Sequence, residues 1–151
     1  MSGVNENVKR PVWPKLTSEV IHGFAASCLT PFMDEASQFA PCHFDWWEYC
    51  CSDNKFVAIC APRGHAKSTI ITITYTLATI LFRQRKYVII VADTETQAAL
   101  FLGQIKQILC DSTEIHKLFG LNIGEKGLVF EKETETDMIV RFKDNTCFRI
   151  V

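Results

Sequence analysis

The stretch Lys55-Phe-Val-Ala-Ile-Cys60, followed by Ala61-Pro-Arg-Gly-His-Ala-Lys67-Ser68-Thr69, decides the fold that the sequence predicts. Residues 56–60 form a short apolar run, typical of a strand buried on both faces of a parallel sheet. The run leads into a loop of small residues that ends in Lys-Ser-Thr. This order matches the phosphate-binding P-loop, G-x-x-x-x-G-K-[ST], except that Ala61 and Ala66 replace its two glycines.

The loop carries the residue types that bind a nucleoside triphosphate. Phosphate binding needs converging backbone N–H groups, a helix N-terminus and a nearby cation. Lys67 would neutralise the β and γ phosphates, and the Ser68 hydroxyl would coordinate Mg²⁺. Arg63 lies inside the loop, where its guanidinium can stabilise charge that develops on the γ-phosphate. The predicted ATP-binding residues are Ala61, Pro62, Arg63, Gly64, His65, Ala66, Lys67, Ser68 and Thr69, with Arg63 and Lys67 as catalytic residues and Ser68 as the metal ligand.

An ordinary helix start after a turn is the alternative interpretation of the Lys-Ser-Thr sequence, and the flanking segments argue against it. Residues 68–82 are rich in β-branched side chains, which favours a strand. Their apolar positions nevertheless share one helical face, and a phosphate loop must lead into a helix, so we predict a helix. Residues 87–92 form a second apolar run, and Thr94 with Gln97 has capping-box spacing before a helix over 98–110. Strand, helix, strand and helix in succession predict an α/β fold with a parallel sheet core. His65 is expected to be a loop side chain and not a catalytic base.

The segment before the loop is predicted to be helical. The spacing of apolar residues over 17–39 indicates a helix, which Thr30-Pro31 is expected to end. Asp45 is predicted to cap a short helix within the aromatic segment 41–51. That segment has two interpretations: a helix packed on the sheet, or an adenine platform drawn from His43, Phe44 and Trp47.

The segment after the second helix is predicted to contain short strands. A short helix is expected over 111–118, ending near Gly120. Strands are expected over 128–131, 138–143 and 146–151, and the last two are joined at Asp144-Asn145 in a tight hairpin.

Composition limits the function classes. A chain of 151 residues with a net charge of −1 has no global positive field to attract nucleic acid or membrane. No apolar run approaches the ~20 residues of a membrane span. The seven cysteines form no C-x-x-C pair, and a zinc site from Cys42, His43, Cys50 and Cys51 would match no standard spacing, so we expect a reducing, cytosolic environment. The basic trio Arg83, Arg85 and Lys86 is expected to be a solvated helix end, with contact to DNA or a neighbouring subunit as the alternative.

Three stretches give the chain a resemblance to the large terminase subunit of tailed bacteriophages, at the start of its ATPase domain. The loop over 61–69 resembles that family's deviant Walker A motif, which has an arginine inside and often alanine for glycine. Residues 87–99, Tyr-Val-Ile-Ile-Val-Ala-Asp-Thr-Glu-Thr-Gln-Ala-Ala, resemble the family's next strand and helix start. Residues 43–47, His-Phe-Asp-Trp-Trp, lie where the family places its adenine-contacting region. The resemblance covers roughly residues 40–151, and the loop is its most specific part.

The resemblance implies a viral DNA-packaging motor that hydrolyses ATP to translocate double-stranded DNA into a procapsid. If the roles of the family's matching residues apply here, Lys67 and Ser68 bind ATP and Mg²⁺, and Arg63 acts in hydrolysis or its coupling. The implied partners are the portal protein and the small terminase subunit, in a homo-oligomeric ring without a membrane. The implied location is the host cytoplasm, with transient docking on the procapsid.

The expected domains are an N-terminal arm and helix over 1–40 and the N-terminal portion of a P-loop ATPase domain over 41–151. The chain stops at Val151 inside an apparent strand, and no strand ending in an acidic pair follows the second helix. We therefore expect a truncated piece without the Walker B strand or the family's nuclease domain, inactive by itself. The alternatives are another P-loop DNA-processing ATPase or helicase, and a truncated non-enzymatic interaction fragment.

Overall fold

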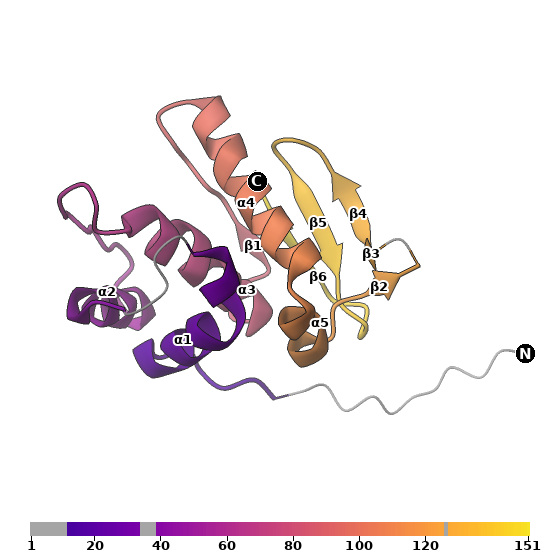
Figure 1. Ribbon diagram of the computed structural model, residues 1–151, viewed down its shortest axis with the longest axis horizontal. Helices are drawn as coiled ribbons and strands as arrows, with labels where there is room; N and C mark the ends of the chain where they lie inside the picture. Colours follow the sequence, from indigo (N-terminus) through magenta and orange to yellow (C-terminus); the bar gives the residue numbers. More distant parts are fainter. Residues whose placement is uncertain (1–11, 34–38, 126) are drawn as a thin grey trace, which may run out of the picture.

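A computed structural model describes residues 12–33, 39–125 and 127–151 of the chain. Figure 1 shows helices α1, α2 and α3 grouped beside the sheet, with α4 lying across one of its faces. The strands form a four-stranded sheet and a separate two-stranded hairpin. Among the described residues, no helix is both long enough and apolar enough to cross a membrane.

The predicted N-terminal helix is confirmed over its described part. It comprises α1 Ser18–Phe24, a π-helical turn η1 Ala25–Leu29 and a 3₁₀ turn η2 Thr30–Phe32. The Thr17 side chain caps α1 by accepting a hydrogen bond from the Val20 N–H. The rest of the predicted segment, 34–38, lies outside the described residues, as do the first eleven residues of the predicted arm.

Helix α2 Pro41–Cys51 contains the aromatic segment, but the predicted cap is wrong. Asp45 lies inside the helix, four residues past its first residue. Pro41 occupies the first helical position, where its fixed φ and missing N–H cause no loss, so the helix begins earlier. The His43 ring serves as the cap, since its Nδ1 accepts a hydrogen bond from the Ala40 N–H at 3.2 Å.

The helix predicted over 68–82 is confirmed. It consists of a π-helix, η3 Ser68–Tyr75, continued by α3 Thr76–Leu81. Tertiary burial outweighs the β propensity of the local sequence, because Ile70, Leu77 and Leu81 are almost fully buried against the core. Thr74 donates its hydroxyl to the Thr69 carbonyl five residues earlier at 2.8 Å, in keeping with the wider winding.

Helices α4 Glu95–Asp111 and α5 Thr113–Phe119 agree with the sequence prediction. Thr94 caps α4 by accepting from the Gln97 N–H, as its spacing predicted. Ser112 caps α5 by accepting from the Ile115 N–H. Gly120 ends α5 in the left-handed conformation, with a φ of 62°, which glycine adopts without steric cost.

The four-stranded sheet has the order β1-β6-β5-β4. Its strands are β1 Tyr87–Val88, β4 Phe130–Glu133, β5 Met138–Arg141 and β6 Cys147–Ile150. Strand β1 pairs with β6 in parallel, whereas β6 with β5 and β5 with β4 pair antiparallel. The short strands β2 Ile123–Gly124 and β3 Gly127–Leu128 form the separate hairpin. The sheet is therefore mixed, not the parallel core that the sequence predicted, although the predicted hairpin at Asp144-Asn145 is confirmed.

The strand predicted over 56–60 is not formed. These residues are irregular and pair with no described strand, and the Phe56 side chain is 93% exposed. In the sheet order β1-β6-β5-β4, β1 pairs with β6 on one side, and no described strand, 56–60 included, pairs with its other side. An apolar run has the side chains of a buried strand, but a strand also needs a neighbouring strand to accept and donate its backbone hydrogen bonds.

A single hydrophobic core joins the N-terminal helices, α3, α4, α5 and the sheet. Aromatic rings dominate the end of the core nearest α5, where Phe24, Phe82 and Phe119 make mutual edge-to-face contacts. On the sheet, Asp137 receives two hydrogen bonds of 2.8 Å from Arg149 and one from Lys132, and these contacts lower its pKa to about 2. All seven cysteines are free thiols.

Candidate phosphate-binding loop

The backbone between the irregular segment and η3 follows an alternating pattern. Gly64 and Ala66 have positive φ values of 83° and 52°, whereas His65 between them does not. Lys67 returns to the right-handed helical region, with φ −49° and ψ −48°. The sign of φ thus alternates over residues 64–67, as in the arrangement called a nest, in which successive N–H groups turn toward one concave side.

The N–H groups of this nest have no acceptor in the part of the chain that the structure describes. The same holds for the backbone N–H groups of all residues over 64–69. The first helical hydrogen bond of the segment runs from the Ile70 N–H to the Ala66 carbonyl, at 2.9 Å. The first turn of η3 therefore contributes its unsatisfied donors to the same place, and the combination suits an anion.

Lys67 places its charge beside the loop. Its ammonium donates to the carbonyl oxygens of Ala61 and Pro62, the latter at 2.8 Å, so the side chain folds back across the start of the loop. No carboxylate of the described residues forms an ion pair with it. The charge is held by two neutral carbonyl groups and remains available to an incoming anion.

The other predicted loop residues lie on the surface of the same segment. Arg63, His65 and Ser68 are exposed, and Thr69 is half-buried in the first turn of η3. The Arg63 guanidinium and the Ser68 hydroxyl form no hydrogen bond or ion pair with a described residue. The structure thus brings all nine predicted residues, 61–69, into one continuous loop and helix start.

Helix α2 braces the loop through His43. Its Nε2 lies 3.3 Å from the His65 carbonyl oxygen, while its Nδ1 accepts from the Ala40 N–H. These two bonds fit the neutral tautomer that carries its proton on Nε2, with Nε2–H donating to the loop. Burial lowers the pKa of His43 and favours this neutral form. This bracing role of His43 was not predicted from the sequence, where it is a candidate for stacking or metal binding; Pro41, two positions earlier, is the signal that His43 lies in a first helical turn.

The structure supports the packed-helix interpretation of the aromatic segment, and the adenine platform stays a prediction. Trp47 is fully buried, and its Nε1–H donates to the Ile70 carbonyl at 3.1 Å, joining α2 to η3. Tyr75 adds a second link from its hydroxyl to the Cys50 carbonyl at 2.7 Å. Phe44 is half-buried against His22 and Trp47. These rings are used for packing, so the segment is a packed helix, although it packs on α1 and η3 and not on the sheet.

The described residues form no metal centre of their own. They contain no group of three or more His, Cys, Asp or Glu side chains placed to hold an ion. Ser68 therefore offers Mg²⁺ a hydroxyl ligand without carboxylate support from the described residues, and the zinc site considered from Cys42, His43, Cys50 and Cys51 is not formed. With this geometry, an Mg²⁺ ion would depend on the phosphates themselves and on water for its remaining ligands.

Comparisons with protein-family models, with curated protein sequences and with solved structures found no match to this chain. Its function therefore has to be argued from the loop itself.

Proposed function

We propose that the chain binds the phosphates of a nucleoside triphosphate, ATP with Mg²⁺, at residues 61–69. The observation that carries the proposal is the alternating backbone of Gly64, His65, Ala66 and Lys67, whose N–H groups are free of backbone partners. A concave row of donors, the start of a helix and a lysine ammonium together supply what a phosphate chain requires. In this proposal Lys67 contacts the β and γ phosphates, Ser68 coordinates Mg²⁺, and Arg63 contacts the γ-phosphate.

The proposal extends to binding and not to turnover by these residues alone. ATP hydrolysis in P-loop enzymes uses a carboxylate to hold Mg²⁺ and a residue that positions the attacking water. Among the described residues, no carboxylate contacts Ser68 or Lys67. We therefore expect the 151-residue chain to bind ATP and to hydrolyse it little or not at all.

We further propose that the loop belongs to a DNA-packaging motor of the large terminase type. The support is the resemblance of the loop, with Arg63 inside it and alanines at 61 and 66, and of the segment over 87–99. Double-stranded DNA, the portal protein, the small subunit, a homo-oligomeric ring and a cytoplasmic location belong to this extension of the proposal.

Nucleotide-dependent thermal stability tests the binding proposal directly. At a ligand concentration ten times Kd, binding to the folded state alone stabilises it by about 1.4 kcal/mol. For a chain of this size, that corresponds to a rise in Tm of about 3–6 °C. We expect Mg-ATP to give such a rise, and Lys67→Ala to abolish most of it. Lys55→Ala is the matched control, because Lys55 is exposed and lies before the loop.

Two outcomes would contradict the proposal. If Mg-ATP leaves the Tm of the native chain unchanged at millimolar concentration, the loop does not bind nucleotide. If Lys67→Ala and Lys55→Ala respond to Mg-ATP like the native chain, the nucleotide binds elsewhere. Comparison with inorganic triphosphate shows whether the phosphates alone are sufficient.

A further inference from the structure

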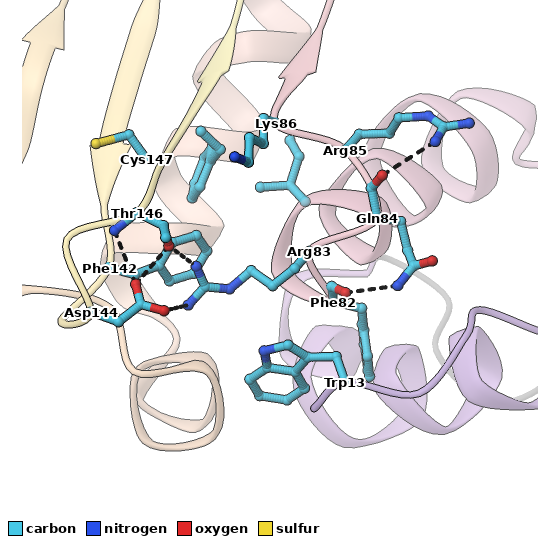
Figure 2. A pocket seen from close by; sticks show the side chains of 12 residues that line it. Trp13, Phe82, Arg83, Gln84, Arg85, Lys86, Phe142, Asp144, Thr146 and Cys147 are labelled. Atoms are coloured by element: carbon cyan, nitrogen blue, oxygen red, sulfur yellow. Dashed lines mark hydrogen bonds and ion pairs between the residues drawn. The ribbon is translucent and has the colours of Figure 1, made fainter. Parts of the chain in front are cut away.

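A cavity of about 340 Å³ opens at the C-terminal end of α3, the helix that continues η3. The helices η3 and α3 contain eight and six residues, so the C-terminal end of α3 lies about 20 Å from the loop. Figure 2 shows the cavity between Trp13 and Phe82 on one side and Phe142 of the β5–β6 hairpin on the other. Its volume lies at the small end of the range for small-molecule sites.

Arg83 crosses the cavity from the end of α3 to the hairpin. Its guanidinium carbon lies 3.1 Å from the centroid of the Phe142 ring, and its terminal nitrogens contact Asp144, at 3.5 Å, and Thr146. Asp144 is held in turn by the Thr146 N–H and hydroxyl, at 3.0 and 2.6 Å. The Arg83 charge is therefore neutralised, and the side chain forms a fixed wall.

Two N–H donors in this wall are buried without an acceptor among the described residues: Trp13 Nε1 and Arg83 Nε. Figure 2 shows the Trp13 indole nitrogen turned toward the Arg83 side chain. Both atoms are donors and neither can satisfy the other, and a buried donor without a partner is destabilising by about 1–3 kcal/mol. An acceptor oxygen that enters between them with a small shift of the indole would satisfy both.

The rim of the cavity is cationic. Figure 2 shows the Lys86 ammonium turned into the space between the walls, whereas Arg85 turns back to the Gln84 carbonyl. Neither Arg85 nor Lys86 forms an ion pair with a described carboxylate. With Arg83 paired to Asp144, two positive charges remain unbalanced around an aromatic cavity.

We propose that this cavity binds a small molecule with a flat apolar ring and one anionic oxygen group. The ring lies beside Trp13 and Phe82, because the Arg83 guanidinium already covers the face of Phe142. The anionic group faces Lys86, and an oxygen accepts from the two orphaned N–H groups. The lining is mixed: four of its twelve residues are aromatic, and among the polar ones Arg83, Asp144 and Thr146 bond to one another. The site shares no residue with the loop over 61–69 and does not rest on the proposed nucleotide binding.

The indole N–H of Trp13 provides the readout. In a ¹H–¹⁵N spectrum the chain has three indole signals, since it has three tryptophans, and Trp13→Phe assigns the relevant one while keeping a ring at that position. We expect 2-naphthoate to shift this signal in a saturable manner. The neutral isostere 2-naphthamide should bind at least tenfold more weakly, equal to about 1.4 kcal/mol. Acetate, which has the charge without the ring, should leave the signal in place.

The variant Lys86→Gln tests the charge. It should lower the affinity for 2-naphthoate toward that for 2-naphthamide and leave 2-naphthamide binding unchanged, while Lys55→Gln changes neither. An indole signal that does not move with 2-naphthoate would overturn the proposal, as would equal affinity for the two probes or a Lys86→Gln variant that binds like the native chain. Mg-ATP added to the same sample should leave the Trp13 indole signal unchanged, which separates this site from the loop.

Discussion

At the scale of single residues, the two alanines that replace glycine in the loop are not equivalent. Ala61 is followed by a proline and its φ is not positive, so a side chain there meets no backbone penalty. Ala66 has a φ of 52°, in the left-handed region that alanine adopts at a cost of roughly 1–2 kcal/mol. Such a conformation persists only where the surrounding structure imposes it, and it is often found at functional sites.

We expect Ala66→Gly to stabilise the folded chain and Gly64→Ala to destabilise it. Glycine at 66 removes the strain, although its greater freedom in the unfolded chain offsets part of the gain, which leaves roughly 0.5–1 kcal/mol. At Gly64, a new Cβ would meet nothing within 4 Å, so the loss of roughly 1 kcal/mol would come from the φ of 83° alone.

Chemical denaturation measures both changes in the free energy of unfolding, provided that each variant has the same m-value as the native chain. If Gly64→Ala is neutral or stabilising, the loop does not hold its alternating backbone in solution. Mg-ATP binding by Ala66→Gly should be at least as tight as in the native chain, because the nest is made from main-chain groups.

The sequence alone singles out the residues of the candidate loop because their chemistry is local, and their role in binding stays a prediction. A lysine, a hydroxyl and small residues in this order can be recognised without knowing what surrounds them. The role of His43 was not predictable, because its partner, the His65 carbonyl, lies 22 residues along the chain and on a different element.

At the scale of elements, α2 fixes the position of the loop and of the helix that follows it. His43 contacts the loop carbonyl, Trp47 contacts η3 at Ile70, and Tyr75 of η3 contacts the last turn of α2. Each of these bonds joins a side chain to a main-chain carbonyl, so they constrain backbone positions and not merely side-chain packing. The loop proposed to bind phosphate is thus held from behind by a helix, through bonds that leave the N–H groups of the loop unused.

This bracing should weaken as the pH falls. Burial lowers the pKa of His43 from its ordinary value of about 6.5, so the folded chain binds fewer protons there than the unfolded chain. The stability that depends on neutral His43 is therefore fully present above pH 6.5 and is lost as the pH falls below it, through the lowered folded pKa. Protonation also removes the Nδ1 acceptor that the Ala40 N–H uses.

We expect the native chain to lose more stability between pH 7.5 and 5.5 than His43→Gln, whose amide can still donate to the loop but does not titrate. His65→Gln is the control: it removes an exposed imidazole whose charge contributes less than burial to the lowered pKa of His43, so most of the native pH dependence should remain. Urea midpoints at the two pH values give the comparison. A pH dependence that is the same in His43→Gln and the native chain would show that His43 is not the titrating group.

Helices were easier to predict than strands for a physical reason. The start of α4 depends on Thr94, and the end of α5 depends on Gly120. Each acts on residues within one helical turn of itself. A strand depends on a partner that the chain can supply from any distance. The 138–143 and 146–151 strands were predicted correctly because each is the other's neighbour across a short turn, residues 143–145, whereas 56–60 has no described partner.

At the scale of the whole molecule, two extended apolar segments stand without a full set of backbone partners. Residues 56–60 pair with no described strand. Residues 87–91 pair with β6 along one edge only, through alternate residues, and Ile89 and Val91 are 59% and 86% exposed. Exposed strand edges of this kind are sites where backbone groups of further chain segments can pair.

Hydrogen exchange of the backbone amides gives a sharp test of this arrangement. The Ile90 N–H donates to the Val151 carbonyl at 2.8 Å, while no described residue accepts from the amides of Ile89 and Val91. Exchange should therefore alternate along this segment, slow at Ile90 and fast at its two neighbours. The amides of 56–60 should exchange at rates near those of a free chain. The amides at the centre of β5 should exchange about 10³-fold more slowly, or slower still, because a global stability of ~5 kcal/mol corresponds to about that factor. Protection at 56–60 comparable to that in β5 would contradict the topology, because it would require a strand partner that the sheet order β1-β6-β5-β4 does not provide.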